Sequence, residues 1–318
     1  MTSLTFIIMI FLILIGVPVA YSILGAGTLF LIVSSIKPLL LIPQRMTTGL
    51  DSFPLLAVPL FIFVGELMDR GGISRRMVNW AESLLGWIPG GLGIVTIASC
   101  AMFAALTGSG PATVAAIGSI MIPSLVKNGY SLKRAAGMTA AGGALGPIIP
   151  PSIPMIIYGV TMSLSIPKMF IAGIIPGIFL MFLLIIVNVF ISIKNPQILK
   201  ESRKSFSLKE LIINTWRSLG ALLLPLIILG GIYSGVFTPT EAAAIGVVYS
   251  LIVGIFIYKE IAIRDLLTLL VKSMETAAMI NIIIAAANLL SWIMSATEIG
   301  KSVINILTQF SIFTLSLV

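Results

Sequence analysis

The feature that most restricts the fold of this chain is a series of apolar stretches that are each of helix length. They lie at about residues 4–34, 52–68, 88–106, 110–126, 135–160, 169–193, 218–237, 240–258, 266–294 and 302–318. A helix needs roughly 20 apolar residues to cross a bilayer, whereas the strands of a membrane barrel are about 10 residues long and alternate in polarity. Charged residues make up only 9% of the 318-residue chain, compared with about 25% in soluble domains. The sequence therefore predicts an all-α integral membrane protein.

Two neighbouring stretches are separated by a very short link. The sequence TGSG, at residues 107–110, joins the stretch 88–106 to the stretch 110–126. The second stretch is barely long enough to cross a bilayer alone. We therefore expect residues 88–126 to form a re-entrant helical hairpin, which enters the membrane and returns to the same side.

The basic residues give the orientation of the chain, because the cytoplasmic segments of membrane proteins are enriched in Lys and Arg. We expect a cytoplasmic N-terminus, and with residues 88–126 re-entrant, fifteen of the nineteen Lys and Arg residues are then cytoplasmic, in the segments 69–87, 127–134, 194–217 and 259–272. The other four lie outside: Lys37, Arg45, Lys168 and Lys301. The charges follow the rule only if residues 88–126 do not cross the membrane. The net charge of +8 thus reports orientation rather than nucleic-acid binding.

The two ends of the chain share a weak internal repeat. A shift of 221 residues places Pro18 on Pro239 and Ser52 on Ser273, and the corresponding stretches run in opposite directions through the predicted membrane. Inverted repeats of this kind are typical of secondary transporters. We therefore predict three parts: a first repeat at 1–193, a basic cytoplasmic loop at 194–217 and an incomplete second repeat at 218–318. The first repeat consists of two spans, the hairpin 88–126, a broken helix at 135–160 and a span at 169–193.

The predicted hairpin tip carries residues that suit a tight turn followed by a new helix. Gly108 and Gly110 accommodate a positive φ, and Pro111 suits the first turn of a helix. Ser109 or Gly110 would cap that helix, with Thr113 in its first turn. Free N–H groups at a helix start favour an anion or the negative end of a dipole. An ordinary turn between two helices would account for the same residues.

A second irregular segment, GALGPIIPPSIP, interrupts the apolar stretch 135–160 with four prolines. A proline in a helix interior costs about 3 kcal/mol, and irregular backbone at membrane depth is tolerated only inside protein or beside water. A single proline would indicate a kink without a ligand, but four exceed what a kink requires. We therefore expect an unwound link that exposes the carbonyl groups of Gly143 and Gly146 and the hydroxyl group of Ser152 to a cation and a substrate.

Acidic residues in or near the apolar stretches are also candidates for a function. Glu66 is the best of them for a proton relay. Glu275 follows Lys272 by three residues, which favours an ion pair along one helix. Glu241 lies at a predicted helix start, where an acid is favourable.

Three segments of the chain closely resemble the large membrane subunit of the tripartite ATP-independent periplasmic (TRAP) transporters. They are TGSGPATVAAIGSIMIP, NGYSLKRAAGMTAAGGALGPIIPPSIPMIIYGV and GVFTPTEAAAIGVVYSLIVG. The resemblance covers nearly the whole chain. It implies an inverted-repeat, elevator-type symporter in the bacterial inner membrane that uses sodium to import organic acids, such as C4-dicarboxylates, sialic acid or sugar acids. It also implies two partners, a small membrane subunit and a periplasmic substrate-binding protein.

The resemblance further implies which residues bind the substrate and sodium. The hairpin tip would face the broken helix, and the site would contain Ser109, Gly110, Thr113, Gly143, Gly146, Pro147 and Ser152. Sodium would be coordinated at Ser109, Gly110, Gly146 and Ser152. Sodium is then the coupling ion, and no other cofactor is expected.

The resemblance also implies that the chain is incomplete at its C-terminus. Family members include a second hairpin and a second broken helix, and the 221-residue shift moves the equivalent of the hairpin tip beyond Val318. Two other functions remain open: a truncated fragment that does not transport, and a related ion-coupled anion carrier that needs no binding protein. An enzyme is not expected, because the chain has no His and no nucleophile–base pair in a water-exposed segment.

Overall fold

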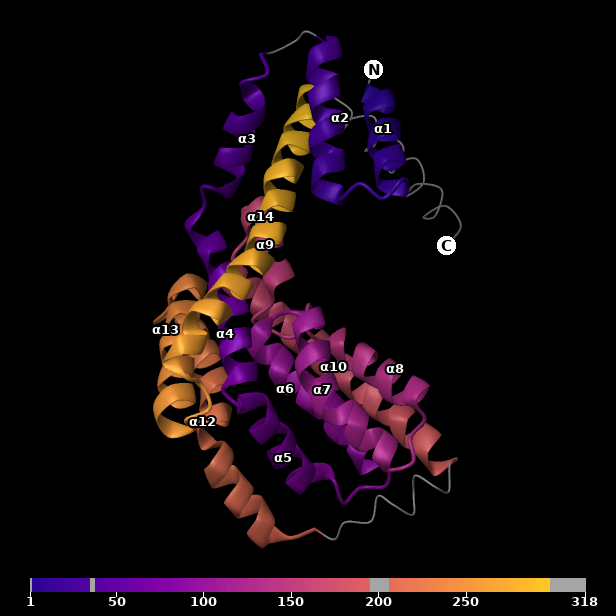
Figure 1. The fold of residues 1–318 in the computed structure, drawn as a ribbon, viewed down its shortest axis with the longest axis vertical. Coiled ribbons are helices and arrows are strands. Elements are labelled where there is room, and N and C mark those ends of the chain that lie inside the picture. The colour runs from indigo at the N-terminus through magenta and orange to yellow at the C-terminus, as the bar shows by residue number, and fades with distance from the viewer. Residues whose placement is uncertain (1, 35–37, 195–205, 298–318) are drawn as a thin grey trace, which may run out of the picture. The chain divides into compact units, whose positions relative to one another are not determined.

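The computed structural model describes residues 2–34, 38–194 and 206–297, and within these ranges every regular element is a helix (Figure 1). The described helices form two compact units, one drawn from Met1–Ser52 and Ala277–Val318 and the other from Phe53–Thr276. Five described helices are long and apolar enough to cross a membrane: Gly110–Lys127, Ile166–Ile193, Leu208–Tyr233, Pro239–Ile257 and Ile263–Ala296. This agrees with an all-α membrane protein.

Within the described residues, the first unit contains four helical segments. They are α1 (Thr2–Leu14), α2 (Val19–Ser34), α3 (Leu41–Leu50) and the C-terminal part of α14 (Leu266–Ala296). α1 and α2 lie side by side as an antiparallel pair (Figure 1). α2 packs on α14 through a buried cluster of Phe30, Leu31, Leu289 and Ile293. Apolar burial against α14 therefore holds this pair in place.

The apolar stretch 4–34, which the sequence suggested as one helical span, consists of two helices. α1 ends at Leu14, and Gly16 follows with a φ of 91°, in the region that glycine adopts without strain. Pro18 follows, just before α2. Proline has no N–H to donate to a helix, so it does not extend α1. At 1.5 Å per residue, α1 is about 20 Å long and α2 about 24 Å, each shorter than a bilayer core of about 30 Å. Because the pair is antiparallel, Thr2 and Ser34 lie at the same end of it.

The second unit contains the remaining helices. They are η1 (Phe53–Leu56), α4 (Ala57–Arg70), α5 (Ile73–Leu85), α6 (Gly91–Thr107), α7 (Gly110–Lys127), α8 (Leu132–Gly143), α9 (Ile153–Thr161), α10 (Ile166–Ile193), α12 (Leu208–Tyr233), α13 (Pro239–Ile252), the π-helix η2 (Val253–Ile257), η3 (Ile263–Asp265) and the start of α14. α4 packs on α13, α5 on α12, and α7 and α8 on each other.

α6 is the most buried helix of this unit. Nearly all of its side chains are buried, and it contacts α5, α7, α8 and α10. A helix that is apolar on every side is expected in such a central position. Its start is held by Asn188 of α10, which donates a hydrogen bond to the carbonyl oxygen of Gly90 at 3.2 Å. Gly93 leaves room for this amide, since a Cβ there would lie 2.6 Å from Asn188 Cγ.

The helices differ from the predicted connections in two places. α12 begins at Leu208, where Ser207 caps it by accepting a hydrogen bond from the N–H of Glu210 at 3.3 Å. The basic loop predicted at 194–217 is therefore helical from residue 208, and residues 195–205 lie outside the described residues. α5 lies within the segment 69–87, which the sequence assigned to the cytoplasm without predicting a helix there. The predicted stretch 302–318 also lies outside the described residues.

Candidate functional site

The hairpin tip is closed by one glycine and one serine. α6 ends at Thr107, and Gly108 follows with a φ of 61°, in the left-handed region that favours glycine. Ser109 is extended, with φ −129° and ψ 122°, and its side-chain oxygen accepts a hydrogen bond from the N–H of Ala112 at 3.4 Å. Ser109 is therefore the N-cap of α7, which is one of the two caps that the sequence allowed.

The proline-rich segment separates α8 from α9. α8 ends at Gly143, and turns and bends occupy residues 144–151 before α9 begins at Ile153. Ser152 is extended, with φ −121° and ψ 124°, and its side-chain oxygen accepts a hydrogen bond from the N–H of Met155 at 3.3 Å. The helix is therefore broken within 135–160, as predicted.

α7 and α9 begin in the same way. In each helix an extended serine forms the N-cap, and a proline, Pro111 or Pro154, stands two residues later. Proline suits this position because the first N–H groups of a helix have no partner within the helix. The pattern Ser-X-Pro thus marks both helix starts.

The two helix starts are in direct backbone contact. The N–H of Ile153 donates a hydrogen bond to the carbonyl oxygen of Gly108 at 3.2 Å. A Cβ at Gly146 would lie 2.6 Å from the backbone nitrogen of Gly110, and a Cβ at Gly110 would lie 2.9 Å from the carbonyl oxygen of Gly143. These distances leave no room for a side chain without a backbone shift. The structure therefore brings the hairpin tip onto the broken helix.

Hydroxyl groups surround this contact. The hydroxyl of Ser152 donates to the carbonyl oxygen of Pro147 at 2.6 Å, and that of Thr113 donates to the carbonyl oxygen of Ser109 at 2.8 Å. Thr107 Oγ1 lies 3.4 Å from Thr113 Oγ1 and 3.4 Å from the backbone nitrogen of Ser109. Thr107 was not among the predicted site residues, although its position as the first residue of TGSG could have indicated that it lies at the hairpin tip.

All seven predicted site residues lie at this contact or beside it. Thr113 is fully buried under Ser109, and Ser152 is fully buried next to Pro147. Among the seven, Ser109, Gly110, Gly143 and Gly146 meet through backbone atoms, and the ring of Pro147 lies near Gly110.

At the start of α9, the N–H groups of the first turn are all used. That of Ile153 bonds to Gly108, that of Met155 bonds to the Ser152 hydroxyl, and Pro154 has none. This helix start therefore has no free N–H group for an anion, whereas an uncapped helix start would have several.

At the start of α7, a backbone donor remains unused, and so does a nearby acceptor. Within the described residues, the N–H of Gly110 has no acceptor and the carbonyl oxygen of Gly146 accepts no hydrogen bond from a backbone or side-chain donor. The described residues also contain no group of three or more His, Cys, Asp or Glu side chains that could hold a metal ion. A cation at this contact would therefore be held by neutral carbonyl and hydroxyl oxygens, which suit a hard ion.

The acidic residues have other partners. Lys272 donates to Glu66 Oε2 at 2.8 Å. The spacing along the helix had suggested Glu275 as the partner of Lys272, but its partner is Glu66. Glu241 accepts from the N–H of Thr238 at 2.8 Å and completes a capping box at the start of α13. The prediction that Glu241 stabilises a helix start is confirmed.

Membrane-length helices, with a helical hairpin whose tip rests on a broken helix, define a multi-pass membrane protein of the transporter type. The chain belongs to the family described as "Tripartite ATP-independent periplasmic transporter, DctM component", whose model matches residues 6–318. The large-subunit resemblance seen in the sequence is therefore confirmed.

Curated relatives agree with this assignment. The chain is 39% identical over 289 residues to the isethionate TRAP transporter permease protein DctMQ of Oleidesulfovibrio alaskensis, covering 91% of this chain and 45% of that protein. It is 41% identical over 259 residues to the C4-dicarboxylate TRAP transporter large permease protein DctM of Vibrio cholerae, covering 81% of this chain and 56% of that protein. It is 36% identical over 293 residues to the 2,3-diketo-L-gulonate TRAP transporter large permease protein YiaN of Escherichia coli, covering 92% and 68%. The chain thus spans about half to two thirds of the length of these relatives.

Proposed function

We propose that this chain is the large membrane subunit of a sodium-coupled secondary transporter that imports an organic acid across the bacterial inner membrane. The observation that carries the proposal is the backbone contact between the hairpin tip and the broken helix, where Gly110 faces Gly143 and Gly146. In secondary transporters, unwound carbonyl groups coordinate the coupling ion, and the starts of half-helices face the anionic group of the substrate.

Sodium binds, in this proposal, between the two Ser-X-Pro helix starts. The Gly146 carbonyl and the Ser109 hydroxyl are the principal ligands, because Gly146 and Ser109 lie at the contact and the carbonyl accepts no hydrogen bond from the described residues. Ser152 contributes its remaining lone pair, since its hydroxyl already donates to Pro147. Gly110 and Thr113 complete the site from the hairpin side.

The substrate is a small organic anion. The printed names of the relatives specify isethionate, C4-dicarboxylate and 2,3-diketo-L-gulonate, which are all anions. The free N–H of Gly110 supports an anionic group near the sodium ion, because a helix start favours negative charge. An elevator movement of the hairpin with its broken helix would carry both ligands across the membrane.

Two partners belong to the proposal, a small membrane subunit and a periplasmic substrate-binding protein. The tripartite description of the family supports both. The chain then acts as the ion-coupled membrane part of the system, and selectivity depends largely on the binding protein.

The membrane topology follows the charge distribution, with residues 69–87 cytoplasmic and the hairpin 88–126 re-entrant. The antiparallel α1–α2 pair supports an N-terminus on the same side as residue 38, which is the periplasmic side, instead of the cytoplasmic position expected from the sequence. The 221-residue shift supports this revision, because it aligns α1 and α2 with the end of α12 and with α13. Each helix then runs opposite to its counterpart.

Transport is tested by reconstituting the protein into liposomes with both partners and measuring uptake of labelled organic acids under an inward sodium gradient. We expect uptake that disappears when choline replaces sodium. Sodium-independent uptake would overturn the coupling. Full uptake without the binding protein would favour an ion-coupled carrier that works alone.

Topology is tested with single cysteines and a membrane-impermeant thiol reagent. The native Cys100 is fully buried and is not expected to react. Cysteines at Asn79 and Asn128 should both be labelled from the cytoplasmic side, and cysteines at Ser3 and Leu40 both from the periplasmic side. Labelling of positions 79 and 128 from opposite sides would exclude the re-entrant hairpin, and labelling of positions 3 and 40 from opposite sides would exclude the revised N-terminus.

A further inference from the structure

A cavity of about 540 Å³ lies between α5, α12 and the end of α13. Its lining includes Arg75, Arg76, Arg217 and Glu260, together with the amide side chains of Asn79 and Asn214. Three of these side chains are basic and one is acidic. The cavity therefore has a positive net charge.

One of the three arginines is fixed by the protein itself. The guanidinium of Arg76 pairs with Glu260 Oε1 at 2.5 Å, donates to the carbonyl oxygen of Gly72 at 3.0 Å, and lies 3.7 Å from the ring centroid of Tyr258. The backbone carbonyl of Arg76 accepts from the Ser218 hydroxyl at 2.9 Å. Arg76 thus holds α5 against α12 and the end of α13, and it neutralises Glu260.

The other two arginines are available for a ligand. Arg75 and Arg217 are exposed and make no ion pair or hydrogen bond within the described part of the chain. They project from two different helices, α5 and α12, into the lining of the same cavity. Guanidinium groups are the side chains best suited to bind a phosphate group, because their forked donors match its oxygens.

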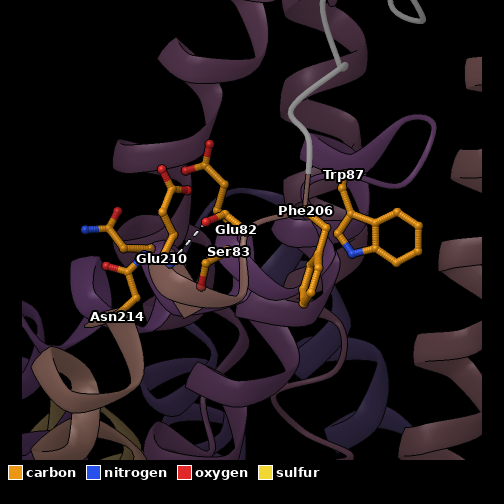
Figure 2. Close-up of a pocket in the computed structure, with 8 residues that line it drawn as sticks. Glu82, Ser83, Trp87, Phe206, Glu210 and Asn214 are labelled. Atoms are coloured by element: carbon orange, nitrogen blue, oxygen red, sulfur yellow. Dashed lines mark hydrogen bonds between the residues drawn. The ribbon is translucent and has the colours of Figure 1, made fainter. Parts of the chain in front are cut away.

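The charge changes sign along the groove between α5 and α12. A neighbouring cavity of about 140 Å³ shares Asn79 and Asn214 with the first, but it is lined by the carboxylates of Glu82 and Glu210 (Figure 2). Glu82 follows Arg75 by seven residues on α5, which is about 10 Å along a helix. An anion is therefore favoured at the arginine end of the groove and disfavoured at the other end.

The arginine end also carries the features of a membrane interface. Trp216, beside Arg217, is 73% exposed, and Ile257 is 61% exposed. Tryptophan is enriched at the level of lipid headgroups. The three segments that line the cavity, 69–87, 194–217 and 259–272 with the adjoining end of α13, contain twelve of the nineteen basic residues of the chain. These are the segments that the charge distribution assigns to the cytoplasmic side.

We propose that this cavity binds the phosphate of an anionic phospholipid of the inner leaflet, held by Arg75 and Arg217. Basic pockets between membrane helices on the cytoplasmic side are suited to such headgroups. Trp216 and Ile257 face the upper acyl chain, and the lipid joins α5 to α12 next to the Arg76–Glu260 pair. This site is separate from the sodium site and does not depend on sodium coupling.

The test compares lipid binding by three forms of the purified protein. The double variant R75Q/R217Q removes two positive charges from the cavity and leaves Arg76, Glu260 and Tyr258 in place. The matched control K127Q/K133Q removes two exposed positive charges from another predicted cytoplasmic segment, and neither lysine lines the cavity. Binding is measured by native mass spectrometry and by the shift in thermal unfolding on adding phosphatidylglycerol or cardiolipin, with phosphatidylcholine as the neutral lipid.

One arginine near an anionic lipid contributes a free energy that corresponds to about fivefold in affinity. We therefore expect about 30-fold weaker binding of the anionic lipids to R75Q/R217Q, and a change within about twofold for K127Q/K133Q. Equal losses in both variants would mean a diffuse surface charge and would overturn the site. Displacement of the lipid by millimolar inorganic phosphate would overturn its assignment to a lipid, and equal binding of phosphatidylcholine would overturn the role of charge.

Discussion

The starts of α7 and α9 share one local structure but differ in what they leave free. Each has an extended serine cap followed by a proline at the second helical position. Ser152 is fully buried, and the first turn of α9 has no unused N–H. Ser109 is only partly buried, and Gly110 at the start of α7 keeps a free N–H within the described residues.

This difference indicates that the two helix starts have different roles, one structural and one in ligand binding, although their sequence motif is the same. The α9 start is closed by its own hydrogen bonds and by Gly108, so it acts as a fixed support. The α7 start keeps unused hydrogen-bonding capacity at the surface where the two meet. We expect changes at the α9 start to act mainly on stability, and changes at the α7 start to act mainly on ligand binding.

The largest effect is expected from separating the two helix starts. In G146A the new Cβ would lie 2.6 Å from the backbone of Ser109 and Gly110, and such overpacking costs about 1–3 kcal/mol. The sodium concentration for half-maximal uptake should rise by about tenfold or more, a factor that corresponds to about 1.4 kcal/mol. The control is G137A in α8, where a Cβ meets nothing within 4 Å; it should leave uptake unchanged and stabilise the helix slightly. Normal sodium dependence in G146A would mean that the contact is not the site.

A pair of serine variants tests the separation of roles directly. S152A removes a buried cap and the donor to Pro147, so the free energy of unfolding should fall by about 2 kcal/mol. S109A removes a cap that is only partly buried, so stability should fall by about 0.5 kcal/mol while the sodium requirement rises. Thermal unfolding and sodium-dependent uptake measured on both proteins would decide the matter. If S152A alters sodium affinity more than stability, the division of roles is wrong.

A smaller effect is expected from the hydroxyl of Thr113. T113V keeps the side-chain volume and removes the bond to Ser109, so the sodium requirement should rise by a few-fold, about 1 kcal/mol in binding. T139V is the matched control, because Thr139 is also fully buried and its hydroxyl donates to the backbone of its own helix at 2.9 Å. Equal changes in sodium dependence for both variants would assign Thr113 a purely structural role.

The smallest effect is expected away from both helix starts, at Glu66. Its partner Lys272 has a side chain that is 63% exposed, and exposed ion pairs contribute about 0–1 kcal/mol. E66Q should therefore change stability within this range and leave sodium-dependent uptake unchanged. Loss of uptake in E66Q, with normal folding, would revive the proton-relay hypothesis for Glu66.

The features that the sequence predicted well are those with a local physical cause. TGSG forces a tight turn because glycine accepts a positive φ, and the structure has its hairpin tip there. The prolines of GALGPIIPPSIP end one helix and start another for reasons of backbone chemistry. The meeting of these two segments was an expectation from the family resemblance, and the close approach of Gly110 and Gly146 agrees with it.

The features that were missed depend on weak local signals or on distant partners. Gly16 and Pro18 marked the break within 4–34, but the apolar residues around them concealed it. Ser207 and Glu210 form a recognisable cap signal inside a segment interpreted as a loop. The pair of Glu66 and Lys272 joins residues 206 positions apart, so no local spacing could have revealed it.

The close approach of the tip to the break has a consequence for genetics. Gly108, Gly110 and Gly146 meet the opposite segment through backbone atoms, which every amino acid possesses. No amino-acid substitution removes these backbone atoms. A substitution can only move them, by introducing a larger side chain. A saturation mutagenesis screen should therefore find intolerance at these glycines and broad tolerance at many neighbouring side chains.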